Sequence, residues 1–513
     1  MVGSATLLSR ILGYVRDMII ASLFGAGLAS DAFLAAFRIP NMMRRLFGEG
    51  SLSIAFVPVY TEYLSKEGRK EADRLASSAF RVLAVLLVAV SLIGIVLAPA
   101  IVRVLAYGFA ASPEKFGLCV KLTRIMIPYI FFIGLVALCM GILNVLGHFA
   151  APALAPVGLN VSMIIAVTCA SYWVADQRSR VVWLAVGVLI GGLTQLGMQV
   201  PFLIRYKINF RKPGRIWHPG LTRVVVLMGP VLFGAAVYQI NAMVVTLLAS
   251  MLPQGSISYL YYADRLFQFP YGIFGIAAAT AMLPTLARQA SEQNREALQQ
   301  TFGYAMRMVF FITLPCMAGL IVLREPIVAL LFQRGLFDAQ STRLTASALL
   351  YYTTGLWALS AVRIVLTAFY ALKDTVTPVH MAVLSIAANI VLGILLMGPM
   401  QHNGLALALS LASVINLGLL TWALRRKLGS LGWRRIVSSV SKSLGCACCM
   451  GLVVWEEARW ILPPQNLPGL HLLIGLSVCI LTGIAVFGGL AHVFELPELK
   501  DALEMVARRK QQA

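Results

Sequence analysis

Arginines and acids stand inside stretches of this chain that are otherwise apolar enough to cross a membrane. The first stretch contains S-R-I-L-G-Y-V-R-D, the second D-A-F-L-A-A-F-R-I-P-N-M-M-R-R-L-F-G-E-G, and the second half of the chain contains Y-Y-A-D-R-L-F-Q-F-P. An arginine at the centre of a bilayer costs about 2.5–3.5 kcal/mol on insertion scales. Several such arginines cannot all face lipid, so we expect them to face an aqueous cavity or one another.

The cations of these motifs outnumber the acids. Six arginines stand against four acids, namely Arg10, Arg16, Arg38, Arg44, Arg45 and Arg265 against Asp17, Asp31, Glu49 and Asp264. An excess of positive charge in a cavity of low dielectric attracts an anion, and the planar fork of arginine suits phosphate oxygens. We therefore expect an anionic substrate, a phosphate or diphosphate. For any single arginine, an interhelical salt bridge with one of these acids remains the alternative.

Helical periodicity predicts which of these side chains share a face. In the second stretch, Asp31, Arg38, Arg45 and Glu49 fall on one stripe, but Pro40 kinks the helix, so periodicity does not decide between Arg44 and Arg45. In the first stretch, Arg10 and Arg16 lie about 120° apart, so at most one points straight into a cavity. The second half carries a comparable polar stripe of Ser258, Tyr261, Tyr262, Arg265 and Gln268.

The elements that position these residues are membrane-spanning helices. The chain has 513 residues, of which 59% are hydrophobic and 12% charged, and its mean hydropathy is +0.83. These values indicate an all-α polytopic membrane protein. Apolar runs predict about fourteen spans, at 5–25, 31–62, 76–108, 115–147, 152–176, 181–205, 220–250, 255–288, 297–333, 339–371, 377–400, 403–427, 434–460 and 468–493.

The distribution of the net charge of +21 argues against nucleic acid as a partner. Lysine and arginine collect in alternate loops, at 66–74, 205–215, 425–435 and 500–510, whereas the loops at 24–30, 253–256 and 400–404 are nearly free of them. This positive-inside pattern predicts that both termini are cytoplasmic. No cleavable signal peptide is evident, and the start of the chain is expected to be the first span itself.

No motif points to covalent chemistry. We find no phosphate-binding loop, nucleophile triad or metal cluster, and the eight cysteines favour structural packing over metal or redox work. Asp374 and Asn389 are a candidate cation site, although K-D-T before a helix is more simply a loop and a cap. We therefore expect a transporter without a cofactor, driven by the membrane potential or by an ion gradient.

The two halves of the chain are weakly repeated. L-N-V-L-G-H-F-A-A-P ends at Pro152 and F-Y-A-L-K-D-T-V-T-P ends at Pro378, which is a shift of 226 residues, and a shift of 227 carries Arg38 onto Arg265. A shift of six spans preserves orientation, so the halves are predicted to be parallel repeats with a site between two lobes. The last two spans lie outside the duplication.

These motifs, together with F-V-P in the second stretch, resemble those of the MurJ (MviN) lipid II flippases, a family of the multidrug/oligosaccharidyl-lipid/polysaccharide exporter superfamily. The resemblance covers essentially the whole chain. It implies two six-helix lobes in a V, at 1–215 and 216–430, around a cationic cavity. It also implies a groove for the undecaprenyl tail at 431–495, and it leaves a cytoplasmic tail at 496–513.

The resemblance implies a function and a set of site residues. The function is movement of lipid II, an undecaprenyl-diphosphate-linked peptidoglycan precursor, to the outer leaflet of the bacterial inner membrane by alternating access. The expected partners are lipid II and membrane lipids, and the expected state is a monomer. The implied site comprises Arg16, Arg44 and Arg265, with Arg10, Asp31, Glu49, Asp264, Asn41 and Ser258. Periodicity adds Arg38 and Arg45, which contact substrate or pair with Asp31 and Glu49.

One departure from the family and three rival functions remain at this stage. Many relatives have a glutamate three residues after the arginine of Y-A-D-R, where this chain has Gln268, so a proton or charge role there is in doubt. The closest rival function is a flippase for another polyprenyl-diphosphate glycan. The others are a cation or drug antiporter, which the charge sign disfavours, and a scaffold without transport activity.

Overall fold

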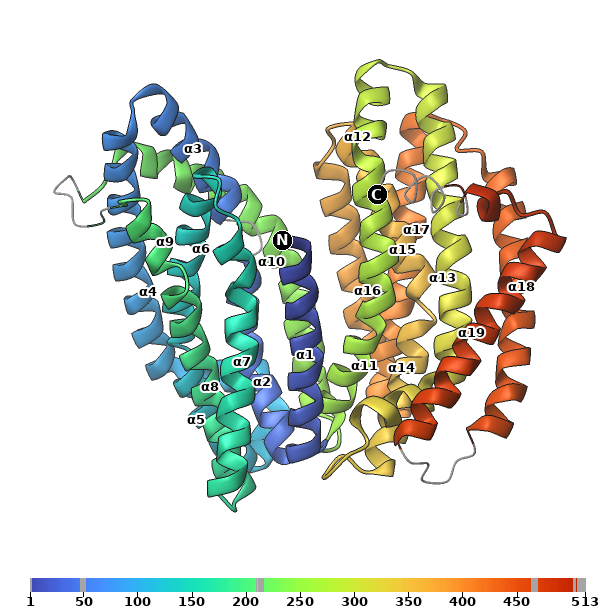
Figure 1. Cartoon of the computed structure of the whole chain (residues 1–513), viewed down its shortest axis with the longest axis horizontal. Helices are drawn as coiled ribbons and strands as arrows, with labels where there is room; N and C mark the ends of the chain where they lie inside the picture. Colours follow the sequence, from blue (N-terminus) through green and yellow to red (C-terminus); the bar gives the residue numbers. More distant parts are fainter. Residues whose placement is uncertain are drawn as a thin grey trace. The chain divides into compact units, whose positions relative to one another are not determined.

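The computed structural model describes residues 2–46, 52–208, 210, 216–462, 469–501 and 504, and the regular elements of these ranges are helices (Figure 1). In chain order they are α1 (Val2–Phe24), α2 (Leu28–Leu46), α3 (Leu52–Lys66), α4 (Arg69–Leu105), η2 (Tyr107–Ala111), α5 (Pro113–Met126), α6 (Tyr129–Val145), α7 (Ala150–Trp173), α8 (Gln177–Gly197), α9 (Val200–Arg205), α10 (Pro219–Ser250), α11 (Ser256–Pro270), η3 (Tyr271–Ile276), α12 (Ala277–Ser291), α13 (Arg295–Phe332), α14 (Ala339–Thr353), α15 (Leu356–Ala371), α16 (Val376–Met400), α17 (His402–Leu428), α18 (Trp433–Ile461) and α19 (Gly469–Val493).

The predicted class, an all-α polytopic membrane protein, is confirmed. By length and apolar composition, ten helices of the described residues can cross a membrane, or eleven if the bent pair α14 and α15 is one span. The other three predicted spans correspond to α1, to α2 with α3, and to α10. Two of these helices are not counted as apolar spans because each contains more than two charged residues. These are Arg10, Arg16 and Asp17 in α1, and Asp31 with three arginines in α2.

Apolar side chains on the outside of these helices mark the lipid-facing surface. The most apolar window of α16 has a mean hydropathy of 2.3, yet only 11% of it is buried inside the protein. Trp173 at the end of α7 and Trp460 near the end of α18 are 87% and 84% exposed. Exposed tryptophans at helix ends are typical of the membrane–water interface.

The internal repeat is confirmed by the helix boundaries. The helices α4, α5 and α7 begin at residues 69, 113 and 150, and α13, α14 and α16 begin at 295, 339 and 376, which is 226 residues later in each case. The capping residues follow the same shift. Ser112 caps α5 by accepting a hydrogen bond from Lys115 N, and Asp338 caps α14 by accepting one from Ser341 N at 2.8 Å. The same local signals therefore start equivalent helices in both halves.

Contacts divide the chain into two compact units. Unit 1 comprises residues 1–258 and 334–337, and unit 2 comprises residues 259–333 and 338–513. The core of unit 1 includes side chains of α3, α4, α6 and α10, and that of unit 2 includes side chains of α12, α13, α15, α17, α18 and α19. In unit 2, for example, Phe311 of α13 packs on Phe487 of α19 with ring centroids 5.1 Å apart.

The unit boundary differs from the repeat boundary predicted at residue 215. By the repeat, α10 is the first helix of the second half, but it packs on α2, α3 and α4 in unit 1. Two contacts hold the start of α10, namely a hydrogen bond between His218 and Glu71 at 3.1 Å and an ion pair between Arg223 and Glu62 at 2.7 Å. The domain boundaries predicted from the repeat and the resemblance stay predictions.

Candidate substrate-binding site

Asp31 of α2 lies at the centre of a buried polar network in unit 1. Its side chain is 1% exposed, and one carboxylate oxygen accepts hydrogen bonds from Lys115 Nζ and Gly255 N, both at 2.8 Å. The other oxygen accepts from Ser258 N at 3.1 Å and from Ser258 Oγ at 2.8 Å. Ser30 Oγ bonds to the same serine hydroxyl at 3.0 Å. The carboxylate thus joins α2, α5 and the first turn of α11.

The partner of Asp31 is a lysine that sequence reasoning missed. Lys115 is 8% exposed, and its ammonium group also lies 4.3 Å from the ring centroid of Phe109. A buried carboxylate is stable only when it is paired and hydrogen-bonded, and Asp31 satisfies both conditions. The available signal was a basic residue at the end of a loop that should be poor in lysine and arginine. Asp31 and Ser258, both predicted to contact substrate, are placed here as each other's partners.

Arg16 of α1 contacts a neighbour on its own helix and a residue of α7. The guanidinium is 6% exposed and bonds Asp17 Oδ1 through Nη2 at 2.6 Å and through Nε at 3.0 Å, while Nη1 donates to Asn160 Oδ1 at 3.1 Å. The amide nitrogen of Asn160 in turn donates to Ser9 O at 3.1 Å. Asn160 on α7 was not predicted, although an asparagine in a membrane span is itself a signal. The Asp17 contact is a salt bridge between neighbouring residues of α1 and not the interhelical salt bridge given as the alternative.

The other charged residues of α1 and α2 lie in different surroundings. Arg38 Nη2 donates to Ala242 O of α10 at 2.8 Å, and Arg44 Nη2 donates to Asn41 Oδ1 at 3.1 Å, one turn back on its own helix. Arg44 and Arg45 are both partly buried, so burial does not distinguish between these two residues after Pro40 of α2. Arg10 is exposed. Glu49 lies outside the described residues.

Unit 2 contains the predicted Asp264 and Arg265, both partly buried on α11. Gln268 Nε2 donates to Asp264 Oδ2 one turn back, so this amide acts as a donor to an acid. Unit 2 also holds an arginine that sequence reasoning missed. Arg363 is exposed on α15, and its Nε donates to Tyr271 Oη. The sequence signal that could have identified Arg363 is the one used for the six predicted arginines, namely an arginine inside a membrane-length apolar segment.

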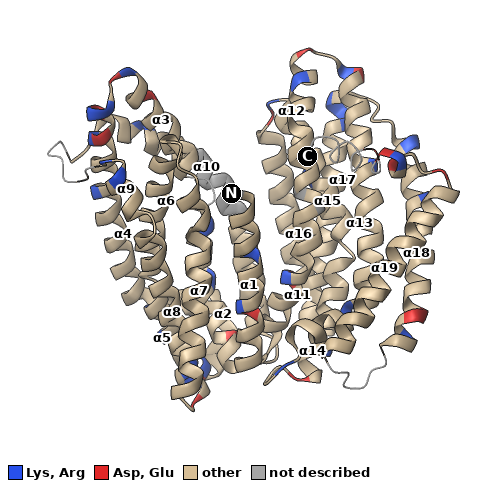
Figure 2. Ribbon diagram, in the orientation of Figure 1, with Lys and Arg blue, Asp and Glu red and all other residues tan. Residues whose placement is uncertain are grey.

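Charged side chains are distributed unevenly along each unit (Figure 2). In unit 1, Lys and Arg gather at the end that carries the α3–α4 turn, and in unit 2 they gather near the α12–α13 turn and the start of α18. Further basic residues lie between the helix ends on α1 and α11. Among the described residues, no group of three or more His, Cys, Asp or Glu side chains could hold a metal ion.

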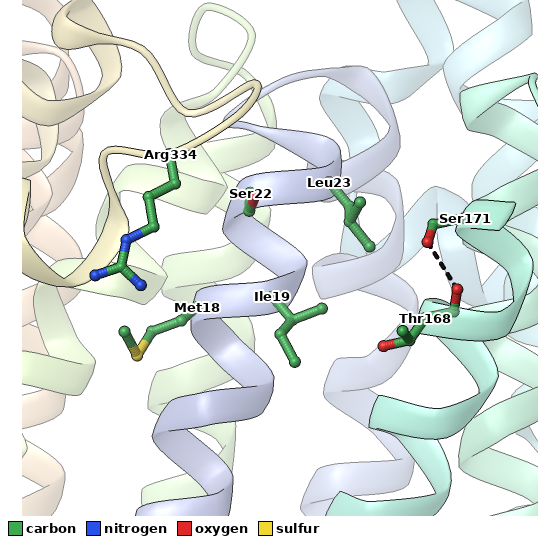
Figure 3. Close-up of a pocket in the computed structure, with 7 residues that line it drawn as sticks. All are labelled: Met18, Ile19, Ser22, Leu23, Thr168, Ser171 and Arg334. Atoms are coloured by element: carbon green, nitrogen blue, oxygen red, sulfur yellow. Dashed lines mark hydrogen bonds between the residues drawn. The ribbon is translucent and has the colours of Figure 1, made fainter.

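One pocket of unit 1 lies away from the predicted residues (Figure 3). It has a volume of about 300 Å³ and is lined by Met18, Ile19, Ser22, Leu23, Thr168, Ser171 and Arg334. Arg334 is the one charged residue of this lining, and most of the exposed lining is apolar. The pocket shares no residue with the predicted site and lacks the several cations expected around a diphosphate. We therefore do not assign substrate binding to it.

Asp374 behaves as a loop and capping residue. Its Oδ1 accepts hydrogen bonds from Val376 N at 3.1 Å and Thr377 N at 3.0 Å, and its Oδ2 accepts from Lys427 Nζ. Partial burial favours the neutral carboxyl, but the hydrogen bonds from Lys427 and Thr377 outweigh it and lower the pKa of Asp374 to about 2. The interpretation of K-D-T as a loop and cap is confirmed.

The fold resembles that of a solved transporter of the MOP superfamily. A solved structure described as the inward-facing conformation of a multidrug resistance MATE family transporter covers 82% of this chain and 95% of its own, with a TM-score of 0.71; at 15% sequence identity this likeness concerns the fold alone.

The family follows from closer matches. The model of the lipid II flippase MurJ family matches residues 20–474. The protein named "Probable lipid II flippase MurJ" of Vibrio cholerae serotype O1 is 37% identical over 98% of this chain and 97% of its own. A structure described as lipid II flippase MurJ in an inward closed conformation covers 96% of this chain and 98% of its own, with a TM-score of 0.80 and 29% identity. The chain belongs to the MurJ lipid II flippase family.

Proposed function

We propose that this chain moves lipid II from the inner to the outer leaflet of the bacterial cytoplasmic membrane for cell-wall synthesis. The observation that carries the proposal is membership of the MurJ family over residues 20–474. The chemistry of the helices supports it, because both units place arginines inside membrane-length segments, for example Arg44 on α2 and Arg265 on α11. Guanidinium groups at such positions suit the diphosphate of a lipid-linked precursor.

The contacts of the arginines suggest distinct roles. Arg44 and Arg265 are partly buried and are proposed to bind the diphosphate. Arg16 is buried and bonded to Asp17 and Asn160, so we assign it to holding α1 against α7 and to direct contact only if it releases these partners. Arg10 is exposed and is proposed to attract the anionic head. Asp31 and Ser258 are proposed to keep α2 joined to the first turn of α11.

The proposed mechanism is alternating access without covalent chemistry. The head group of lipid II occupies a cationic cavity, its anionic groups neutralise the repulsion among the arginines, and the two lobes close and reopen toward the other side. The undecaprenyl tail stays in the bilayer beside α18 and α19. The driving force is the membrane potential or an ion gradient, and one charge moved through 100 mV supplies about 2.3 kcal/mol. We propose a monomer with both termini in the cytoplasm.

Complementation tests this function. Cells depleted of their own lipid II flippase receive the wild-type chain, Arg44→Ala, Arg265→Ala or the control Arg288→Ala at matched expression. Arg288 is an exposed arginine of α12 that lies 4.0 Å from Glu292. The readouts are growth and the exposure of lipid II on the outer leaflet. We expect wild type and Arg288→Ala to restore both, and the other two variants to restore neither.

Other outcomes would contradict the proposal in different ways. Failure of a well-expressed wild-type chain would exclude lipid II as substrate and favour another polyprenyl-diphosphate glycan. Full rescue by Arg44→Ala and Arg265→Ala would leave lipid II in place but remove the proposed diphosphate contacts. An antiporter would show cation efflux that survives Arg265→Ala, since a positive residue does not bind a cation.

A further inference from the structure

We propose that the segment 494–501 after α19 is a strap that fixes the α18–α19 hairpin on α13, and that Glu498 of this strap is a positioning residue for transport. The inference rests on the proposed function for one point, namely that the hairpin supports the undecaprenyl tail. The strap itself rests on side chains of α13, α18 and the segment 494–501, none of which belongs to the predicted set of site residues.

The α18–α19 hairpin needs an attachment that apolar packing alone does not specify. In the most apolar windows of α18 and α19, 39% and 28% of the residues are buried inside the protein. The buried side chains pack on α13, as Phe487 does on Phe311. Lipid chains are as apolar as these side chains, so apolar contacts favour one position of a membrane helix only weakly. A buried polar contact at a fixed place can select the position.

The chain turns back directly after α19. Leu496 N donates to Ala491 O at 2.9 Å, Glu495 N donates to His492 O at 3.1 Å, and Glu495 has a φ of 50°. This is the hydrogen-bond pattern of a Schellman motif, which ends a helix. Residues 497–501 then form one helical turn. Leu496 is 2% exposed and belongs to the core of unit 2, so the segment folds onto the helix ends.

One carboxylate oxygen of Glu498 joins two helices. Its Oε1 accepts hydrogen bonds from Arg307 Nε of α13 at 2.8 Å and from Ser439 Oγ of α18 at 2.9 Å. The side chains of Glu498 and Arg307 are 1% and 23% exposed, so salt screens this ion pair little. Removing either partner leaves the other charge buried and unpaired, so the ion pair favours one arrangement of α13, α18 and the strap.

The place of the strap connects it to the proposed transport. Arg307 lies in the first half of α13 and Ser439 is the seventh residue of α18, so the strap fixes the ends of these helices that the basic loops predict to be cytoplasmic. In the proposed mechanism, the tail of lipid II starts from this leaflet. A hairpin held at constant spacing from α13 is preorganised for the tail, and preorganisation strengthens binding.

Distances between spin labels test the strap without any substrate. In a full chain without its native cysteines, the labels are attached to Gln300→Cys on α13 and Val493→Cys on α19, both exposed positions. We expect one narrow distance distribution in this background and in the added control Glu495→Gln, since Glu495 is an exposed acid of the strap. Glu498→Gln should broaden the distribution. A distribution unchanged by Glu498→Gln, or broadened equally by Glu495→Gln, overturns the strap.

Variants of the two partners separate the ion pair from general instability. Arg307→Gln should broaden the distribution, and Arg307→Lys should broaden it less, because lysine keeps the charge. Equal broadening by these two variants would contradict the ion pair. Where Glu498→Gln and Arg307→Gln elute as aggregate, Ser439→Ala replaces them, since it removes one donor to Glu498 and keeps the ion pair. An unchanged distribution in Ser439→Ala then overturns the strap.

Binding to the purified full chain in nanodiscs tests the positioning role of Glu498. The probes are undecaprenyl diphosphate, which has the tail, and inorganic diphosphate, which lacks it. We expect Glu498→Gln to weaken binding of undecaprenyl diphosphate about fivefold and to leave binding of inorganic diphosphate unchanged, whereas Glu495→Gln should change neither. An equal loss for both probes would assign Glu498 a structural role alone and overturn its positioning role.

The two measurements distinguish failure of the strap from failure of the proposed function. If Glu498→Gln broadens the distances but wild type binds neither probe, the strap stands, whereas the proposed function and the positioning role fail. If Glu498→Gln broadens the distances and leaves binding of undecaprenyl diphosphate unchanged, the positioning role alone is overturned. Weaker binding with unchanged distances overturns the strap and leaves the proposed function in place.

Discussion

At the scale of single residues, the charges of the membrane helices differ in how deeply they are buried and in which side chains they contact. Asp31 uses both carboxylate oxygens on Lys115, Gly255 and Ser258, and it is almost completely buried. Arg363 is exposed and oriented by one tyrosine. A carboxylate whose acceptor sites are filled contributes stability and alignment.

The stability of the Asp31 network gives the first prediction. Asp31→Asn leaves a buried ammonium without its counter-charge, so we expect a loss of about 3–5 kcal/mol in the free energy of unfolding. Unfolding in mixed micelles, followed by tryptophan fluorescence, measures this loss. Glu114→Gln is the matched control, since Glu114 is next to Lys115 on α5, pairs with the exposed Arg178 and should contribute about 1 kcal/mol or less. Equal effects of the two variants would contradict a buried network.

A double variant refines this prediction. Lys115→Met removes the cation but leaves Asp31 with the hydrogen bonds of Gly255 and Ser258, so we expect a smaller loss than in Asp31→Asn. In the double variant Asp31→Asn with Lys115→Met, part of the loss should be recovered, because no unpaired buried charge remains. Strictly additive losses would show that the pair does not interact.

At the scale of elements, two glycines allow a loop of the second half to pack on α1. Leu336 N donates to Ser22 O at 2.8 Å, and Gly25 and Gly335 have φ angles of 60° and 57°. A Cβ atom on Gly25 would lie 2.5 Å from Leu336 O. The segment 334–337 therefore belongs to unit 1 although α13 and α14 belong to unit 2.

This packing predicts a difference between two glycine variants. Gly25→Ala meets both an unfavourable left-handed backbone and a clash, so we expect a loss of about 2–4 kcal/mol. Gly432→Ala has a similar φ of 68° but no neighbour within 4 Å, so its loss should be about 1–2 kcal/mol. The unfolding assay described for Asp31 compares them. If Gly25→Ala lowers the free energy of unfolding no more than Gly432→Ala does, the segment 334–337 can move to accommodate the Cβ atom and the predicted clash is contradicted.

The contact between the start of α16 and the end of α17 has a predicted pH dependence. The pKa of Asp374 is lowered to about 2, so its ion pair with Lys427 stabilises the fold above the ordinary aspartate pKa of about 3.9 and is lost as the pH falls toward 2. We expect wild type to exceed Asp374→Asn in melting temperature at pH 7. The difference should shrink below pH 4, and a constant difference down to pH 2.5 would contradict the ion pair.

At the scale of the whole molecule, the alternation of basic and non-basic loops predicts orientation. In a variant without the native cysteines, a cysteine at Ala175, in the turn between α7 and α8, should react with a membrane-impermeant thiol reagent added to intact cells. One at Glu292, in the turn between α12 and α13, should react only after lysis, because it lies on the basic side. Both positions are exposed. The reverse pattern would invert the proposed topology.

Much of this architecture was predictable from sequence because it depends on local signals. Apolar runs predicted fourteen spans, of which ten or eleven are long and apolar enough among the described helices. The shift of 226 between Pro152 and Pro378 reappears in the starts of α4, α5 and α7 against α13, α14 and α16. Helix starts and membrane length are set by residues close in sequence, so periodicity and caps suffice to place them. The family was likewise evident from contiguous motifs.

The partners of the buried charges were decided only by tertiary structure. Asp31 pairs with a lysine 84 positions away, Arg16 with an asparagine 144 positions away, and Arg363 with a tyrosine 92 positions away. Nothing in the local pattern distinguishes a charge that joins two helices from one that contacts a ligand, since both are polar residues in apolar runs. The sequence alone determined that this chain spans a membrane and that its membrane-length segments contain arginines. The tertiary structure decided which of these charged side chains are buried and paired within the protein, because burial and pairing depend on helices distant in the chain.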